Sequence, residues 1–282
     1  MKPKGLGEIV GFSLLTVSAV LVILILVAII LYIAASGSGS ISWGFLVNFP
    51  TDGMTRGGIF PAIVGTILVT FITTLFSIPL GVSAAIYLSE YAREGRMTRL
   101  IRAAIRNLAG VPSIIYGLFG VALFVRALHF GTSVLASGFT LGLLTLPWII
   151  TTSEEAIKTV PRSYREGALA LGATRWRSIR TIVLPYAFPG IITGAILGLS
   201  RAAGETAPIL FTGVAFYIRK LPGSVFDQFM ALPYHLYVLS TQHHAIEQVR
   251  PLAYGTALVL ITLVFILNLA AVILRYKLRK AY

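Results

Sequence analysis

Arg201 and Glu205 are the residues whose types and spacing most directly suggest chemistry in this sequence. They lie inside an apolar run at about 188–214, where a charge costs at least ~2.5–3.5 kcal/mol. Four residues apart, they would project from one face of a helix. A guanidinium offers phosphate or carboxylate a planar fork of donors. The pair therefore predicts a substrate site, in which Glu205 orients Arg201 or accepts the proton of a protonated oxyanion. The alternative is an internal ion pair that holds the helices together.

Two further residues are candidates for the same pathway. Thr206 follows the charged pair directly, and Arg126 lies near the outer end of another apolar run. The alternative for Arg126 is a side chain that snorkels to the membrane interface.

Several other kinds of chemistry are not expected. The chain has no cysteine, which excludes disulfides and thiol catalysis. His235, His243 and His244 lack the spacing of a metal site, and we expect solvated or interfacial histidines there. No G-x-x-x-x-G-K-[ST] loop is present to hold nucleotide phosphates. We expect no catalytic residue, no metal and no bound cofactor.

The composition predicts a helical membrane protein. Of the 282 residues, 56% are hydrophobic and 12% are charged, against about 25% charged in soluble domains. Apolar runs of about 20 residues cross a bilayer as helices. We expect an all-α fold with six transmembrane helices, at about Val10–Ala35, Pro61–Tyr91, Leu108–Leu128, Val134–Thr152, Phe188–Val214 and Ala253–Arg275. The first run is too long for the apolar core of a cleaved signal peptide, so we expect a retained helix.

The distribution of basic residues predicts the orientation. Lysines and arginines concentrate before the first span, after the sixth, and between spans two and three and spans four and five. By the positive-inside rule both termini are then cytoplasmic. This topology explains the net charge of +13, so nucleic-acid binding is not expected. The basic residues on this side are Lys2, Lys4, Arg93, Arg96, Arg99, Arg102, Arg106, Lys158, Arg162, Arg165, Arg175, Arg177, Arg180, Arg275, Lys277, Arg279 and Lys280, against Arg56, Arg219, Lys220 and Arg250 on the other.

The polar segment before the fifth span predicts two short amphipathic helices. Ser163 and Glu166 fit a capping box, with Pro161 as an alternative first helical residue. Gly172 is a plausible stop for the first helix, and Thr174 can cap the second. The apolar face of the first would comprise Tyr164, Ala168 and Leu171, and that of the second Trp176, Ile179 and Val183. The segment is either a loop on the lipid headgroups or a docking element for a partner protein.

The spacing in this segment resembles the E-A-A-x3-G-x9-I-x-L-P signature of ABC importer permeases. One position departs from it, because Gly167 replaces the middle alanine. The resemblance implies that segment 154–185 carries coupling helices between spans four and five, gripped by a separate ATPase subunit that binds the ATP. The matching residues are Glu166, Gly167, Ala168, Gly172, Ile182, Leu184 and Pro185.

The stretch around the charged pair, RAAGETAP, resembles permease subunits of bacterial phosphate importers. This resemblance implies a multi-pass permease of a bacterial or archaeal cytoplasmic membrane. The implied partners are a homologous permease, an ATPase dimer and an external phosphate-binding protein, with membrane lipid around them. It also makes Arg201 and Glu205 residues needed for phosphate passage. The alternatives are a permease for sulfate or molybdate, and an ion-gradient transporter or channel subunit.

Three regions follow from these assignments. Residues 1–60 would form the N-terminal span and an external connection, 61–275 the transport domain, and 276–282 a basic tail. In the long external loop at 215–252, Val225–Leu239 predicts an interfacial or re-entrant helix that covers an outer gate, or a folded cap without a gating role.

Overall fold

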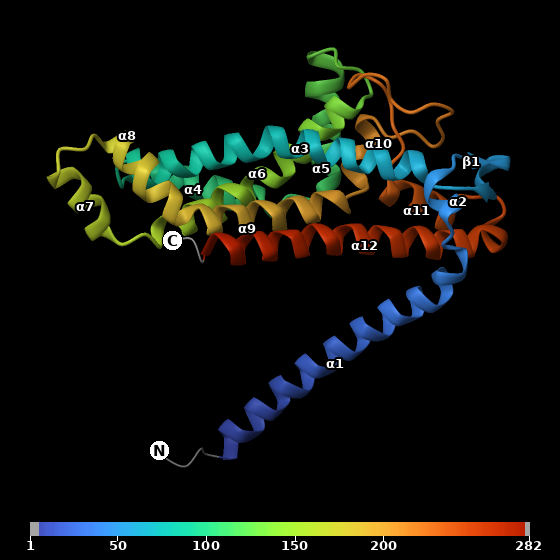
Figure 1. Ribbon diagram of the computed structural model, residues 1–282, viewed down its shortest axis with the longest axis horizontal. Helices are drawn as coiled ribbons and strands as arrows, with labels where there is room; N and C mark the ends of the chain where they lie inside the picture. Colours follow the sequence, from blue (N-terminus) through green and yellow to red (C-terminus); the bar gives the residue numbers. More distant parts are fainter. Residues whose placement is uncertain (1–5, 280–282) are drawn as a thin grey trace.

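Long helices running along one axis make up most of this protein, and the computed structural model describes residues 6–279. Lys2, Lys4 and Lys280 lie outside the described residues. Five helical segments are long and apolar enough to cross a membrane, which confirms an all-α membrane fold. They contain α1 (Leu6–Gly37), α3 (Phe60–Ile86), α6 (Val134–Lys158), α9 (Leu184–Ala203) and α12 (Ile246–Arg279) (Figure 1).

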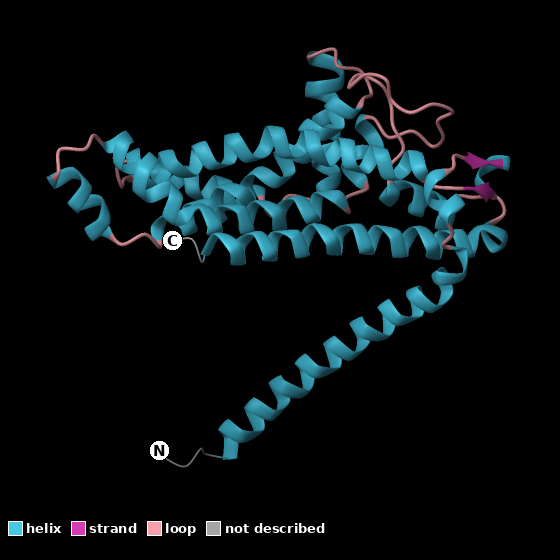
Figure 2. Ribbon diagram, in the orientation of Figure 1, coloured by secondary structure: helices cyan, strands magenta, loops and turns pink. Residues whose placement is uncertain are grey.

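Shorter elements gather at the two ends of the bundle (Figures 1 and 2). The end we call the α7 end carries η3 (Tyr87–Tyr91), α7 (Arg162–Ala170), α8 (Arg175–Ser178) and η5 (Ile179–Val183). The opposite, hairpin end carries η1 (Ser38–Ser40), α2 (Trp43–Val47), β1 (Pro50–Thr51), η2 (Asp52–Met54), β2 (Arg56–Gly57) and α11 (Leu232–Thr241). The two strands pair antiparallel, with Pro50 opposite Gly57.

The core of the bundle is the packing of α3 and α9 on α6. Small residues let these helices approach closely, as is common between helices in membranes. A side chain at Gly138 would strike Ile72, and one at Gly194 would strike Thr152. The buried Thr73 hydroxyl lies 2.8 Å from the carbonyl of Val69 in its own helix and 3.1 Å from that of Gly138 in α6. α12 packs along α9 and α11.

The helical part of the third expected span, Leu108–Leu128, begins only at Ser113, after a sharp bend in the chain. α4 (Arg96–Leu108) and the pair α5 (Ser113–Gly120) and η4 (Val121–Ala127) meet at a bend of 100°. Pro112 stands at this bend, where it cannot continue the helical hydrogen-bond ladder. The structure therefore has five candidate spans, and six if the bent pair counts as one.

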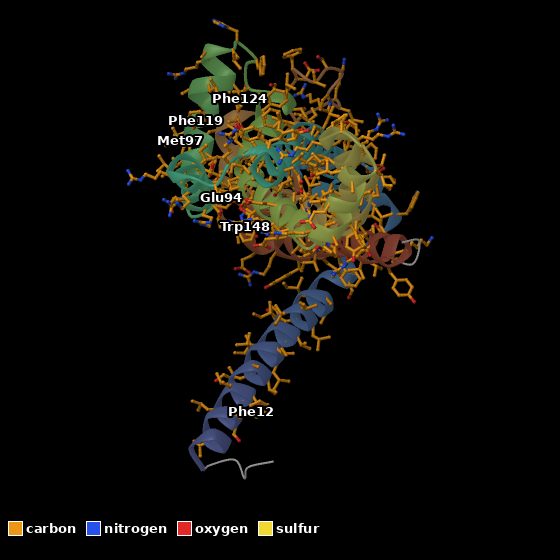
Figure 3. The ribbon with its side chains drawn as sticks, turned by 90° about the vertical axis from the view of Figure 1, so that its left-hand side faces the viewer. Phe12, Glu94, Met97, Phe119, Phe124 and Trp148 are labelled. Carbon is orange, nitrogen blue, oxygen red and sulfur yellow. The ribbon has the colours of Figure 1, made fainter. Side chains whose placement is uncertain are left out.

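α1 leaves the bundle at an angle and touches it only near its C-terminal end (Figure 1). There Gly37 fits against the backbone of Tyr254, and the Tyr32 and Tyr254 rings meet edge to face at 5.6 Å. Further back, Phe12 lies far from the side chains of the other helices (Figure 3). The helix therefore presents apolar residues to its surroundings on all sides.

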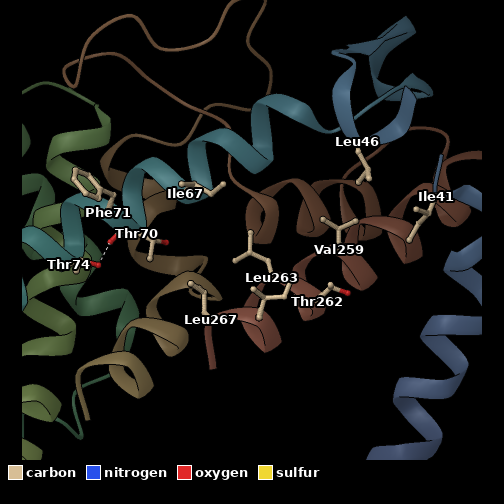
Figure 4. Close-up of a pocket in the computed structure, with 11 residues that line it drawn as sticks. Ile41, Leu46, Ile67, Thr70, Phe71, Thr74, Val259, Thr262, Leu263 and Leu267 are labelled. Carbon is tan, nitrogen blue, oxygen red and sulfur yellow. Dashed lines mark hydrogen bonds between the residues drawn. The ribbon is translucent and has the colours of Figure 1, made fainter. Parts of the chain in front are cut away.

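A groove of about 700 Å³ runs between α3 and α12 (Figure 4). Apolar side chains such as Ile67, Phe71 and Leu263 line it, together with the threonines Thr70 and Thr262. None of its described lining residues is charged. The groove therefore suits acyl chains or another helix, and it does not suit an anion.

Candidate functional site

The first helix of the polar segment, α7, projects beyond the bundle at its far end (Figure 1). It does not begin with the expected capping box, because Pro161 occupies the N-cap and no side chain accepts a hydrogen bond there. Pro161 is thus the N-cap and not the first helical residue, which was the alternative expected from the sequence. Of the expected apolar face, Ala168 is buried, Tyr164 stacks edge to face on Tyr186, and Leu171 is 90% exposed.

Gly172 ends α7 as the sequence predicts. Its φ of +81° lies in the left-handed region, where a β-carbon is unfavourable. The Ala173 amide donates to the Ala168 carbonyl at 3.1 Å, and the Gly172 amide donates to Leu169 at 3.0 Å. These two bonds form a Schellman motif. Gly172 is therefore needed for its backbone conformation, since the space around it is open.

The second helix of the segment is not a separate short element. Thr174 caps it, as expected, by accepting a hydrogen bond from the Arg177 amide at 3.3 Å. It then continues without a break as Arg175–Ala203. A π-helical turn, η5, immediately precedes Pro185 in α9. Pro185 has no N–H to donate back, so the regular ladder is interrupted there.

The seven motif residues divide by exposure. Glu166, Gly167 and Gly172 are exposed, Ala168 is buried, and Ile182, Leu184 and Pro185 are half-buried. On the second helix Ile179 and Val183 are buried as expected, whereas Trp176 is 54% exposed. α7 therefore presents an accessible surface, and the continuous helix anchors it in the core.

Arg165 connects α7 to the bundle, a role not expected from the sequence. Its Nε and Nη2 donate to Glu90 Oε1 at 3.0 and 2.8 Å. Nη1 donates to the Val160 carbonyl at 2.6 Å, and Nη2 also donates to the Ile157 carbonyl at 2.9 Å. Glu90 lies 75 residues away in η3, and its side chain is only 9% exposed. No local pattern could reveal this pair, because the fold alone brings the two residues together.

A second arginine organises the same end. Arg102 of α4 donates to Glu154 Oε1 at 2.7 Å, to Glu94 Oε1 at 2.8 Å and to the Leu88 carbonyl at 2.9 Å. The hydrogen bond from Arg102 to Glu94 and the positive charge of the guanidinium hold the pKa of the Glu94 carboxyl below its usual value. Glu154 also pairs with Lys158 at 2.6 Å. A signal for this cluster exists in the sequence, since Glu154 closely follows an apolar run.

The intramembrane charges meet, although not as expected. α9 ends at Ala203, and Gly204 caps it, so Glu205 lies beyond the helix rather than on its face. The apolar run 188–214 is thus two helices, with α10 (Ala207–Thr212) following the break. Arg201 Nε is still 3.5 Å from Glu205 Oε1. The Arg201 side chain is 48% exposed and that of Glu205 17%, so the guanidinium remains accessible to a ligand.

Neighbouring side chains position Arg201. Its guanidinium carbon is 5.5 Å from the centre of the Trp148 ring on α6, a cation–π contact. The adjacent Ser200 hydroxyl donates to Asn268 Oδ1 of α12 at 2.9 Å. Sequence reasoning missed Trp148 and Asn268. Each is a polar or amphipathic residue within an apolar span, which is an unusual position for it. The sequence alone does not show which residue it contacts.

The two remaining pathway candidates differ in position. Thr206 is half-buried at the break, next to Glu205, and its carbonyl accepts the Leu210 amide at 3.1 Å. Arg126 is exposed in η4, and the structure does not bring it into contact with Arg201.

Two of the three histidines of the long loop are less solvated than expected, whereas His244 is exposed. His235 and His243 are buried, at 3% and 4% exposure, and His243 Nε2 lies 2.8 Å from the Gly53 carbonyl. The predicted helix in this loop exists as α11 at Leu232–Thr241, later in the chain than the apolar pattern indicated. It packs on α12 and α3 at the hairpin end. No cluster of metal-binding side chains was found among the described residues.

Comparison with known families adds to this geometry. Residues 77–280 match the family of binding-protein-dependent transport system inner membrane components. The chain belongs to this permease family. The match begins within α3 and continues through the rest of the bundle, including α7 and the charged break. It decides against an ion-gradient transporter or channel.

Individual relatives agree with the family. The permease is 34% identical over 251 residues to a probable ABC transporter permease, YqgI, of Bacillus subtilis, covering 85% of each chain. It is 38% identical over 221 residues to the phosphate transport system permease PstA 1 of Mycobacterium tuberculosis, covering 78% of this chain and 71% of the relative.

Solved structures show the same fold. The MetNI methionine ABC transporter matches with a TM-score of 0.62 at 19% identity, over 77% of this chain and 94% of that one. A bacterial ABC transporter for alginate import matches with a TM-score of 0.61 at 14% identity, over 80% of both chains. The chain is therefore a permease subunit of an ABC importer in the cytoplasmic membrane, and the ATPase is a separate subunit.

Proposed function

We propose that this permease forms the translocation pathway of an ATP-driven importer for inorganic phosphate. The observation that carries the proposal is Arg201, an accessible guanidinium in a membrane-spanning helix, beside Glu205 at a helix break. Such a guanidinium matches a phosphate oxyanion in charge and geometry. The relatives described as phosphate permeases support the same substrate.

Glu205 has two roles in this proposal. It orients Arg201, and it favours release, because a carboxylate next to the guanidinium weakens the binding of a second anion. In the pathway Thr206 offers a hydroxyl at the same break, and Arg126 lies nearer the outer entrance. The site is transient, and phosphate passes it without any bond being made or broken.

The coupling segment 154–185 receives the ATPase in this proposal. α7 projects from the bundle with Glu166, Leu169 and Leu171 exposed, which suits a helix held in a cleft of another subunit. Gly167 and Ala168 keep the helix narrow, and Gly172 sets its turn. Ile182, Leu184 and Pro185 root the following helix in the bundle.

We further propose that the α7 end is cytoplasmic. Along the long axis of the molecule, the start of α1 and the end of α12 both point toward this end (Figure 1), and the arginines of α7 and α8 are there, as the positive-inside rule requires. The hairpin end then faces an external phosphate-binding protein. A homologous permease would complete the pathway, and two ATPase copies would bind the coupling helices. Residues 61–275 form the transport domain, with 1–60 and 276–282 as additions.

The test is ATP-dependent uptake of radiolabelled phosphate by proteoliposomes that hold the complete importer and its binding protein. We expect uptake that excess sulfate or molybdate does not reduce. Arg201→Gln should abolish it while the ATPase stays bound. Arg250→Gln is the matched control, because its side chain is 54% exposed and likewise paired to a glutamate.

Three results would contradict the proposal. Competition by sulfate or molybdate would identify another oxyanion as substrate. Full uptake by Arg201→Gln would exclude the proposed site. Retention of the ATPase by a Glu166→Lys variant at wild-type affinity would weaken the coupling assignment.

A further inference from the structure

We propose that Arg165 is a positioning residue that transmits movement of α7 to the helices of the pathway, through its ion pair with Glu90. The inference rests on the proposed coupling role of α7. It goes further by naming the contact through which force from the ATPase reaches the bundle.

α7 has few contacts with the bundle other than those of Arg165. α7 makes few tertiary contacts, chiefly with η5 and α8, its neighbours in the chain. Within α7 only Ala168 is buried, and Tyr164 touches Tyr186 through its ring edge. In the described structure Arg165 makes the one ion pair between α7 and another element. Movement of α7 that bypassed Arg165 would pass mainly along the backbone.

The guanidinium of Arg165 reaches two other helices of the bundle. Arg165 places all three of its nitrogens on acceptors, which are the Glu90 carboxylate, the Ile157 carbonyl in the last turn of α6 and the Val160 carbonyl just after it. Glu90 belongs to η3, which directly continues α3. One guanidinium therefore holds α7 to α3 and α6 at once. These two helices form the largest helix–helix contact of the bundle, so they would move together.

The ion pair of Arg165 with Glu90 is largely shielded from solvent. The side chains of Arg165 and Glu90 are 21% and 9% exposed. A partly buried, multiply hydrogen-bonded ion pair resists separation, because removing one partner leaves the other charge without compensation. The pair can therefore carry a load that an exposed salt bridge cannot. η3 is also a π-helical turn, a feature frequent at functional sites.

α4 is attached to the same turn through a side chain in its middle, Arg102. Arg102 donates to the Leu88 carbonyl within η3 and to Glu154 on α6. η3 thus receives one arginine from α7 and one from α4, and Arg175 of α8 also lies over its Tyr91 ring, 5.7 Å from the centre. A shift of α7 would reach α4, and the bent third span that follows it, through this turn.

The experiment compares Arg165→Ala and the conservative Glu90→Gln with wild type in proteoliposomes of the complete importer. Uptake and ATP hydrolysis are measured in the same vesicles. We expect both variants to keep the ATPase bound and to hydrolyse ATP, with about tenfold more ATP consumed per phosphate imported. Arg96→Ala, which removes an exposed arginine of α4, should keep the wild-type ratio. The exchange Arg165→Glu with Glu90→Arg should restore part of the coupling.

A second measurement does not depend on the substrate. Hydrogen exchange of residues 87–91 in the assembled transporter should respond to ATP in wild type and lose this response in Arg165→Ala. An unchanged ATP-to-phosphate ratio in both variants, or an unchanged exchange response, would overturn the proposal. Loss of the ATPase from Arg165→Ala would also overturn it, by showing a docking role. Failure of wild type to import phosphate would instead count against the proposed substrate, and the exchange result would still decide on Arg165.

Discussion

The guanidinium of Arg201 lies over the ring of Trp148, 5.5 Å from its centre, so one aromatic residue of α6 helps to set the position of the charge on α9. Half of the Arg201 side chain remains accessible. The arrangement holds the guanidinium in place without covering it, as a transient anion site needs.

Replacing this ring should impair transport without unfolding the permease. A partly exposed cation–π contact contributes about 0.5–1 kcal/mol, so Trp148→Leu should lower the maximal rate of uptake about two- to fivefold. Trp43→Leu, which changes a 78% exposed tryptophan at the hairpin end, is the control. Equal rates for both variants would show that the ring does not position Arg201.

The turn at Gly172 should tolerate substitution less well than its neighbour in the motif. Gly172→Ala places a β-carbon at a φ of +81° and should cost about 1–2 kcal/mol. We expect weaker binding of the ATPase in a pull-down titration. Gly167→Ala meets open space and should bind at least as well, because alanine favours the helix by about 0.5–1 kcal/mol. The opposite ranking would contradict the Schellman turn.

The cluster around Glu154 should contribute substantially to stability. Glu154→Leu removes the acceptor of Arg102 where both side chains are at most 14% exposed, and should cost about 3 kcal/mol. Lys158→Ala, on a 55% exposed side chain, should cost about 0–1 kcal/mol. Thermal inactivation of the purified permease provides the comparison. The double variant Arg102→Met with Glu154→Leu should regain part of the loss, and a further decrease would speak against a paired cluster.

The hairpin end should weaken in mild acid. Burial, assisted by the nearby His243, lowers the pKa of His235 from 6.5 to about 4. Between these values the unfolded chain binds a proton that the native state does not, so stability falls as the pH decreases from about 6.5 to 4, by at most about 1.4 kcal/mol per pH unit. Above pH 7 this residue contributes no pH dependence.

The measurement is the thermal midpoint of wild type and His235→Leu across this range. The difference between the two proteins should grow as the pH falls. A constant difference would show that His235 titrates alike in the native and unfolded states.

Local patterns predicted the features that local physics determines. The stop at Gly172 and the cap at Thr174 depend on residues a few positions apart, and both are confirmed. The capping box at Ser163 and Glu166 also fitted a local rule, but the helix begins two residues earlier than that box requires, after Pro161. Glycine and proline, which restrict the backbone directly, were the more reliable signals.

Features that depend on contacts between distant parts of the chain could not be predicted from local sequence patterns. The break after Ala203 lies within a run that is apolar on both sides, so hydropathy alone did not separate Glu205 from the helix of Arg201, although Gly204 and Pro208 flank the break. The pairing of Arg165 with Glu90 joins residues 75 positions apart. The burial of His235 depends on packing of α11 against α12 and α3. The sequence of the loop alone does not predict this packing.

The helix from Arg175 to Ala203, continuous through the π-helical turn before Pro185, has a mechanical consequence. Its 29 residues give a rod of roughly 40 Å at 1.5 Å per residue. Arg175, next to the turn that follows α7, stands at one end, and Arg201 stands in the last turn of the other. A tilt of only about 10° about one end would displace the other end by roughly 7 Å, given that length. The helix therefore has the dimensions of a lever arm, which converts a small rotation at one membrane surface into a displacement larger than a phosphate ion.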